Sequence, residues 1–222
     1  MIYSIGHSTL SIEDFVALSG RQYDTLLDVR SHPTSRWSQF YKENLEQWMP
    51  QHGYNYEWWP ELGGWRTDHE CLKDVLAEHG VDLIPYLSGK FPKQRIAAEE
   101  TPSNRPSWTN TGLRDYSFFQ ALPEFLSGCD RLIERGKQEN VAIMCCECQW
   151  WRCHRSMVSD YLAYRGVEVF HIMPRVRQKN KVKYVDGSKI TPHSAVLGNR
   201  IERYEEVIRR VWDKWTTMHG PT

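Results

Sequence analysis

One short stretch constrains the fold more than any other: residues 141–146, VAIMCC, are apolar without a break. A strand with one solvated face alternates apolar and polar residues. A continuous run of this length is instead typical of a central parallel strand covered on both faces. Along the rest of the chain, segments rich in β-branched and apolar residues alternate with segments of helical period. This pattern predicts a mainly parallel α/β sheet flanked by helices, a Rossmann-like three-layer arrangement.

The other elements follow from hydrophobic period and from helix-end signals. Ser11, with Asp14 three positions later, predicts a capped helix that buries Phe15. Further strands are expected at 2–5, 25–29, 54–59 and 167–172, and further helices at 42–52, from Phe118 through about 139, before Gly166 and at 199–215. We expect a single α/β domain over residues 1–222. Within it lie a loop-rich insert at 62–115, with one short helix near 69–79, and a basic segment with a C-terminal amphipathic helix at 175–222.

Charge and composition exclude some classes of partner. The chain has 28 Lys and Arg against 28 Asp and Glu, so no global field attracts nucleic acid or membranes. No apolar run approaches the roughly 20 residues that a bilayer requires, so we expect no membrane partner. Four of the six cysteines lie between 145 and 153, where they cannot connect distant parts of a secreted scaffold. The opening residues contain no export signal. Together these features predict a cytoplasmic protein.

Polar and reactive residues follow the expected strands, where ligands bind in open parallel sheets. Gly6-His7-Ser8 follows the first strand, and Asp28 and Arg30 follow the second, with Arg36 nearby. Glu61 follows the third, and residues 145–155 follow the fourth. We therefore expect these groups to converge at one edge of the sheet.

The stretch from Cys145 to Ser156 admits three interpretations. Cys145, Cys148, Cys153 and His154 are zinc-type ligands, although no second CxxC pair accompanies them. Cys146 and Arg152 have the C-x5-R spacing of a phosphatase loop, although glycine is absent between them. Alternatively, residues 153–156 form the first turn of a helix, where the dipole and Arg155 favour a thiolate or a bound anion. A structural alternative is that Cys145 and Cys146 are small buried residues and Arg155 bridges to Asp28 or Glu147.

Several of these motifs together resemble the family called domain of unknown function 488. The resemblance is carried by Ser4-Ile5-Gly6-His7-Ser8, Asp28-Val29-Arg30-Ser31, Pro60-Glu61-Leu62-Gly63-Gly64, the stretch from Cys145 through Glu147 to Cys153-His154-Arg155, and His171-Ile172. It extends from about residue 2 to 195 and implies a compact α/β domain of unassigned biochemistry. It also implies that His7, Ser8, Asp28, Arg30, Arg36, Glu61, Cys145, Glu147, Cys153, His154 and Arg155 occupy family motif positions. Cys146 and Cys148 look like additions of this protein.

The first functional hypothesis is an enzyme acting on a phosphorylated, nucleotide-type or nucleic-acid substrate, with cleavage or exchange at a glycosidic bond. The expected catalytic residues are His7, Asp28, Glu147, Cys145, Cys153 and His154. The expected substrate-binding residues are Gly6, Ser8, Arg30, Arg36, Glu61, Arg155, Ser156, Trp59 and Trp150. No metal and no cofactor are expected.

Two alternatives come from other classes of function. One is a non-catalytic nucleic-acid-binding module that uses five of the six basic residues of 175–189 as a phosphate track, namely Arg175, Arg177, Lys179, Lys181 and Lys183. The other is a thiol-dependent redox or sulfur-transfer enzyme that acts through Cys145 or Cys153.

Overall fold

The computed structural model describes residues 1–65, 113, 116, 119–179, 182–193 and 211–218, and the side chains of 176–186 are not described. The chain divides into two compact units, Met1–Trp65 with Ser127–Ala195, and Arg66–Leu126 with Val196–Thr222. The prediction of one domain over the whole chain stays a prediction. Most of the expected insert, its short helix near 69–79 and most of the helix expected at 199–215 lie outside the described residues, although 211–218 are helical.

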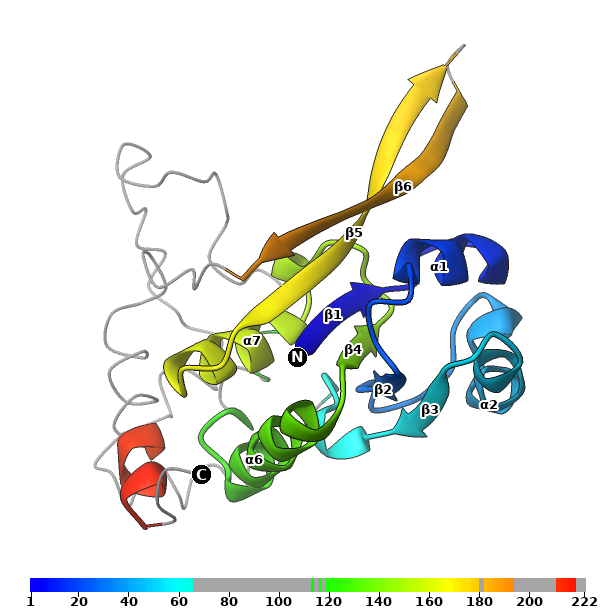
Figure 1. Cartoon of the computed structure of the whole chain (residues 1–222). Helices are drawn as coiled ribbons and strands as arrows, with labels where there is room; N and C mark the ends of the chain where they lie inside the picture. Colours follow the sequence, from blue (N-terminus) through cyan, green and yellow to red (C-terminus); the bar gives the residue numbers. More distant parts are fainter. Residues whose placement is uncertain (66–112, 114–115, 117–118, 180–181, 194–210, 219–222) are drawn as a thin grey trace, which may run out of the picture. The chain divides into compact units, whose positions relative to one another are not determined.

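The first unit contains a mixed, mostly parallel sheet of six strands (Figure 1). Their order across the sheet is β3 (Asn55–Trp58), β2 (Thr25–Asp28), β4 (Val141–Cys145), β1 (Ile2–Gly6), β5 (Val169–Lys179) and β6 (Val182–Pro192). Only β6 runs antiparallel to its neighbour. The predicted α/β class with a mainly parallel sheet is confirmed.

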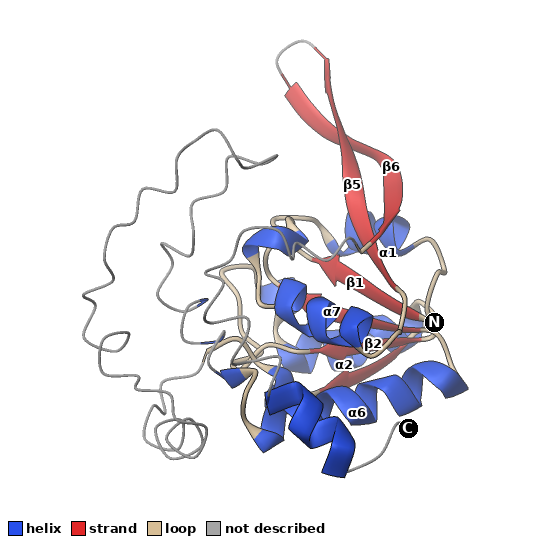
Figure 2. Cartoon of the chain, turned by 90° about the vertical axis from the view of Figure 1, so that its left-hand side faces the viewer, coloured by secondary structure: helices blue, strands red, loops and turns tan. Residues whose placement is uncertain are grey.

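Helices lie on both faces of this sheet (Figure 2). Helices α1 (Ile12–Ser19) and α2 (Lys42–Gln51) bury Phe15, Leu45 and Met49 in one core with Ala142 and Met144 of β4. Helices α6 (Pro123–Gln138) and α7 (Arg155–Tyr164) lie on the other face. Short 3-10 helices span Ser38–Phe40, Pro60–Leu62 and Trp150–Arg152. Because both faces of β4 are covered, its residues are apolar without alternation, as the run at 141–146 predicts.

The ends of helix α1 show how local signals determine element boundaries. The side chain of Ser11 accepts the backbone N–H of Asp14 at 3.0 Å, so the predicted cap is confirmed. At the other end, Gly20 adopts a left-handed conformation with a φ of 56° and its N–H returns to the carbonyl of Val16. The helix therefore ends where only glycine adopts the required backbone without strain.

The outer strand β6 is absent from the sequence expectations. Strand β5 continues seven residues beyond the predicted 167–172, and β6 pairs with it antiparallel, with an irregularity between Pro174 and Val176. Strand β1 pairs with β5 only from Val169 to Ile172, so the remainder forms a two-stranded ribbon that extends beyond the sheet (Figure 1). The sequence of this ribbon is rich in Lys and Arg and holds no continuous apolar run, so it contains no buried-strand signal.

The parallel register brings several strand ends to one edge of the sheet. Gly6 pairs with Cys145, and Asp28 lies between Met144 and Trp58. The residues that follow these strands therefore start from neighbouring positions. No helix in the described part of the chain is long and apolar enough to cross a membrane.

Candidate functional site

Arg30 and Asp28 form a buried ion pair at the end of β2. The guanidinium Nε donates to Asp28 Oδ1 at 2.8 Å and Nη2 donates to Oδ2 at 2.6 Å. Two further N–H groups bond the carbonyls of Phe40 and Thr34, and the hydroxyl of Tyr56 donates to Asp28 at 2.7 Å. Both charges are thus matched inside the protein. A phosphate would have to displace existing partners to reach Arg30.

Arg155, the first residue of α7, is buried and also directs its donors to the protein. Its Nη1 donates to Ser4 Oγ at 2.8 Å, its Nη2 to the carbonyl oxygen of Glu147, and its Nε to Cys153 Sγ at 3.4 Å. The carbonyl, and not the carboxylate, of Glu147 makes this contact. A Cβ at Gly6 would lie 1.9 Å from that carbonyl oxygen, so only glycine allows the loop after β4 to lie this close to β1.

Part of the first turn of α7 also has hydrogen-bond acceptors within the protein. His154 is the N-cap residue, so Arg155 and Ser156 occupy the first turn while Cys153 precedes it. The N–H of Ser156 donates to the carbonyl of Cys153 at 3.0 Å, and the Ser156 hydroxyl donates to the same oxygen at 2.9 Å. The N–H of Met157 donates to the carbonyl of His154 at 2.9 Å. The amide of Ser156, one of those expected to hold an anion, and the next amide along the helix therefore already have backbone acceptors.

His7 directly follows β1 and is buried on the α1 and α2 side of the sheet, opposite to Arg155. Its ring stacks on Phe40 with 4.1 Å between centroids, and its Nδ1 contacts the carbonyl of Ser8 at 2.9 Å. The other ring nitrogen, Nε2, has no hydrogen-bond partner. Burial, with the nearby charge of Arg30, lowers the pKa of His7 to about 3. His7 is therefore neutral at physiological pH.

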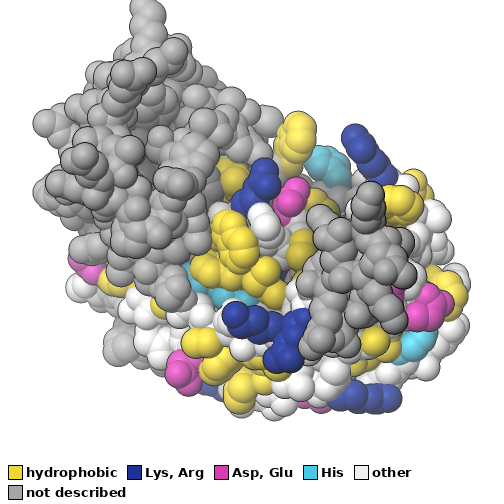
Figure 3. All heavy atoms as spheres, turned by 90° about the horizontal axis from the view of Figure 1, so that it is seen from above, with side chains coloured by type: hydrophobic (Ala, Val, Ile, Leu, Met, Phe, Trp, Pro, Cys, Tyr) yellow, Lys and Arg dark blue, Asp and Glu magenta, His cyan; other side chains and the backbone are white. Residues whose placement is uncertain are grey.

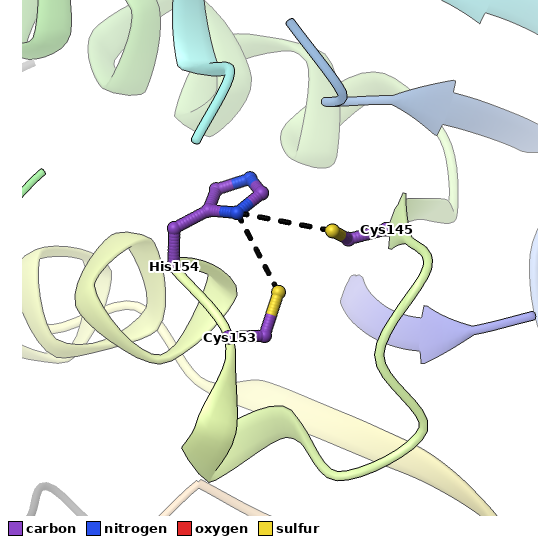
Figure 4. Close-up of side chains that lie close together, drawn as sticks. All are labelled: Cys145, Cys153 and His154. Carbon is purple, nitrogen blue, oxygen red and sulfur yellow. Dashed lines mark hydrogen bonds between the residues drawn. The ribbon is translucent and has the colours of Figure 1, made fainter. Parts of the chain in front are cut away.

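The structure brings Cys145, Cys153 and His154 together (Figure 4). Their sulfur atoms and the imidazole Nδ1 all lie within 4.8 Å of one another, and all three residues are buried. His154 Nδ1 lies 3.5 Å from Cys153 Sγ and 3.8 Å from Cys145 Sγ. The cluster joins the end of β4 to the start of α7, and the loop 146–152 connects the two.

Two backbone contacts orient the imidazole of His154. Its Nε2 donates to the carbonyl oxygen of Val29, just beyond β2, at 3.0 Å. Nδ1 therefore faces both sulfur atoms, with a lone pair in the neutral imidazole and with an N–H in the imidazolium. The backbone of Gly64 packs directly against the ring. A Cβ at this position would lie only 2.3 Å from Nδ1, so any other residue would clash with the imidazole. The Pro60-Glu61-Leu62-Gly63-Gly64 motif thus contributes close backbone packing against the cluster.

The three neighbouring thiols titrate differently. Burial opposes ionisation of Cys153, but hydrogen bonding from Cys145 and the charges of His154 and Arg155 hold its pKa well below the usual range. Hydrogen bonding of the single Cys145 S–H with the sulfurs of Cys146 and Cys153, together with burial, raises the pKa of Cys145 well above that range. Hydrogen bonding from Cys145 lowers the pKa of Cys146 to about 7. Cys145 therefore holds its proton more strongly than its neighbours Cys146 and Cys153 do.

Cys146 is absent from the site residues expected from the sequence, but the structure places it next to the sulfur cluster. It is exposed, and its sulfur lies 3.8 Å from Cys145 Sγ. Its signal in the sequence is its position directly after the last residue of a buried strand. Cys148 is half-buried and is absent from the three-residue cluster, so the four-ligand set containing Cys148 is not assembled.

The aromatic residues expected to stack on a ligand already pack against protein groups. The Trp150 ring lies parallel to His171 at 4.0 Å. Arg131 lies 3.7 Å over the Trp59 ring and also forms an ion pair with Glu61. Of the other expected residues, Ser8 is half-buried with its N–H on the carbonyl of Cys146, and the side chains of Arg36 and Glu147 are exposed.

A chain of polar groups lies on the α7 side of β5. His171 Nε2 contacts His193 Nδ1 at 2.9 Å, and His193 Nε2 contacts Asp160 Oδ1 at 2.9 Å. The second ring nitrogen of His171, Nδ1, is buried without a hydrogen-bond partner. In the β1–β5 register His171 pairs with Ser4, the residue that accepts from Arg155. Arg155 thus lies between the sulfur cluster and the hydrogen-bonded groups His171, His193 and Asp160.

Most of the chain matches a known family model. A family model described as "Domain of unknown function DUF488" matches residues 11–80 and 90–162. No curated protein and no solved structure matches the chain.

Proposed function

The chain belongs to the DUF488 family, whose description assigns no reaction, and from the sulfur cluster we propose that it is a thiol–disulfide oxidoreductase. The redox pair is Cys145 and Cys153, and Cys146 is the thiol that meets the substrate. The observation that carries the proposal is a line of three sulfur atoms from the surface inward: exposed Cys146, then Cys145 at 3.8 Å, then buried Cys153. The substrate class is an accessible disulfide, RSSR.

The exchange begins at the exposed sulfur. The Cys146 thiolate attacks one sulfur of RSSR, which breaks the S–S bond, forms a mixed disulfide and releases RS⁻, which takes a proton from water. Cys145 then loses its proton to solvent and attacks Cys146 Sγ, releasing the second RS⁻. Adjacent Cα atoms lie about 3.8 Å apart, below the 4.4 to 6.8 Å that disulfides prefer, so the Cys145–Cys146 bond is transient.

Cys153 completes the transfer. Its thiolate attacks Cys145 Sγ, forms the Cys145–Cys153 disulfide and regenerates the Cys146 thiolate. In sum, RSSR and two protein thiols give two RSH and one protein disulfide, so two electrons pass to the substrate. The Nε–H of Arg155 on Cys153 Sγ favours the thiolate that this step requires.

Other candidate functions receive less support. The prediction of a phosphorylated, nucleotide-type substrate needs free arginine donors, whereas Arg30 and Arg155 already bond protein acceptors. Figure 3 shows basic, acidic and hydrophobic side chains interspersed over the described part of one face, without an extended patch of one sign there. Binding of nucleic acid through 175–189 also stays a prediction. A cytoplasmic location, expected from the cysteine pattern, would keep the thiols reduced.

Peptide mapping tests the proposal on the full chain. Reduced protein is mixed with bis(2-hydroxyethyl) disulfide, quenched with acid and digested with trypsin. Cys145 lies in the peptide 138–152 and Cys153 in the peptide 153–155, so the expected disulfide joins two separate peptides. Cys146→Ser should slow its formation at least about tenfold, while the matched variant Cys148→Ser should react at the wild-type rate. A mixed disulfide that never passes to the peptide 153–155 would refute the proposal.

A further inference from the structure

We infer that, in the reduced protein, Cys145, Cys153 and His154 bind one thiophilic divalent metal ion of the zinc type. Two sulfur donors and one imidazole nitrogen are the ligands that zinc prefers. The sequence alone argues against a metal because it requires Cys148 as a ligand. The structure assembles three buried donor atoms without Cys148.

The spacing of the donor atoms fits tetrahedral coordination. With metal–sulfur bonds of about 2.3 Å and metal–nitrogen bonds of about 2.05 Å, a tetrahedral site separates sulfur from nitrogen by about 3.6 Å. Nδ1 of His154 lies 3.5 Å from Cys153 Sγ and 3.8 Å from Cys145 Sγ. One ion therefore fits among the three atoms with small adjustments of the side chains.

The surrounding groups prepare the donors for a metal. Metal-binding histidines commonly donate their second ring nitrogen to a carbonyl, and His154 Nε2 bonds the carbonyl of Val29. Arg155 Nε–H donates to Cys153 Sγ, as groups around metal-bound thiolates do. Gly64 leaves room beside Nδ1 that any side chain would fill. Three protein ligands leave the fourth coordination position to water, as in catalytic zinc sites.

This inference deepens the proposed function, on which its regulatory consequence rests. Both redox sulfurs would be metal ligands, so the metal and the Cys145–Cys153 disulfide exclude each other. Oxidation of the bound form by RSSR gives one protein disulfide, two RS⁻ and one released Zn²⁺, whose own charge does not change. The metal would then hold the pair reduced until a disulfide substrate arrives.

Cobalt and zinc titrations of the reduced, chelator-treated full chain test the site. We expect one equivalent of Co²⁺ per chain with a thiolate-to-metal charge-transfer absorption, displaced by one equivalent of Zn²⁺. Cys145→Ser, Cys153→Ser and His154→Gln should each weaken zinc binding at least about tenfold, and the control Cys148→Ser should bind as the wild type. Gly64→Ala, which displaces the imidazole without removing a ligand, should also weaken binding. Circular dichroism checks that each variant is folded.

Two variants separate this inference from the proposed function. Cys146→Ser should bind zinc normally and form the disulfide slowly. His154→Gln should bind zinc weakly and still form the Cys145–Cys153 disulfide. Wild-type protein that binds no stoichiometric Co²⁺ or Zn²⁺, or a folded Cys153→Ser variant that binds it equally well, would overturn the metal site whatever the outcome of the disulfide experiment.

Discussion

His154 places its Nε2–H on the carbonyl oxygen of Val29 at 3.0 Å, and this hydrogen bond decides which ring nitrogen faces the two sulfur atoms. Val29 directly follows β2, so the neighbouring strand orients the imidazole at the start of α7. The same bond suits a metal ligand, because a neutral imidazole with its proton on Nε2 keeps a lone pair on Nδ1. The chemistry of the cluster thus depends on the packing of three chain segments.

Arg155→Ala should destabilise the protein by about 3 kcal/mol, because Ser4 Oγ and the carbonyl of Glu147 lose a buried donor and a cavity remains. Urea unfolding measures the change. The control Arg152→Ala removes an exposed side chain and should stay within about 0.5 kcal/mol. A variant of wild-type stability that loses stabilisation by added phosphate would instead support the nucleotide-type function.

Asp28→Ala should cost about 3 to 5 kcal/mol, because it leaves the guanidinium of Arg30 buried without its counter-charge. Thermal or urea unfolding provides the measurement. The matched control is Glu46→Ala, which removes the exposed pair with Lys42 and should cost no more than about 1 kcal/mol. Equal effects in the two variants would contradict a structural role for the buried pair.

Iodoacetamide should label Cys146 first in the native protein, because its side chain is the exposed one among the cysteines described. Cys129 is buried on α6 and should react on the order of a hundredfold more slowly, through unfolding. Fragment mass spectrometry over time distinguishes the positions, and labelling in urea confirms that both thiols are present. Rapid native labelling of Cys129 would be inconsistent with the described core.

His171 should make the protein acid-sensitive. Burial, followed by the nearby charges of His193 and Arg155, lowers the pKa of His171 to about 2, against about 6.5 when unfolded. Below about pH 6.5 the unfolded chain binds a proton that the folded chain does not, so stability is retained above that pH and falls as the pH decreases. The slope from this group approaches about 1.4 kcal/mol per pH unit.

The variant His171→Asn should remove that part of the slope between about pH 6 and 4, as urea unfolding at several pH values would measure. His7, whose pKa is about 3, contributes the same trend in both proteins and cancels in the comparison. Asp160 reaches His171 only through His193, and Trp150 covers its ring. Exposed His32→Asn is the control. An unchanged slope in His171→Asn would disprove the assignment.

The basic segment provides a separate test of nucleic-acid binding. Strand β5 contains Arg175, Arg177 and Lys179, and β6 contains Lys183. Lys181 lies outside the described residues. If the segment tracks phosphates, Lys181→Ala should weaken binding of a single-stranded oligonucleotide and reduce the salt slope by about 0.7. Fluorescence anisotropy at several salt concentrations measures both. Lys137→Ala on α6 is the control, and identical slopes would exclude the track.

Local sequence signals were sufficient for much of the fold. The unbroken apolar run at 141–146 predicted a strand covered on both faces, because a solvated face requires alternation. Ser11 and Asp14 predicted the start of α1 from the bond between them. These features could be predicted because each depends on residues close together in the chain. The β6 strand could not be predicted in this way. Its residues show no strand pattern of their own, and it forms by pairing with β5.

The chemistry of the site depended on contacts between distant segments. The sequence by itself determined that Cys145, Cys153, His154 and Arg155 follow a buried strand and begin a helix. Only the tertiary structure decided that Cys145 Sγ meets His154 Nδ1, that Val29 sets the tautomer, and that Arg155 bonds protein acceptors and not a free anion. The physical reason is that hydrogen-bond partners within about 3 Å are chosen by packing across the sheet, which spacing along the chain does not encode.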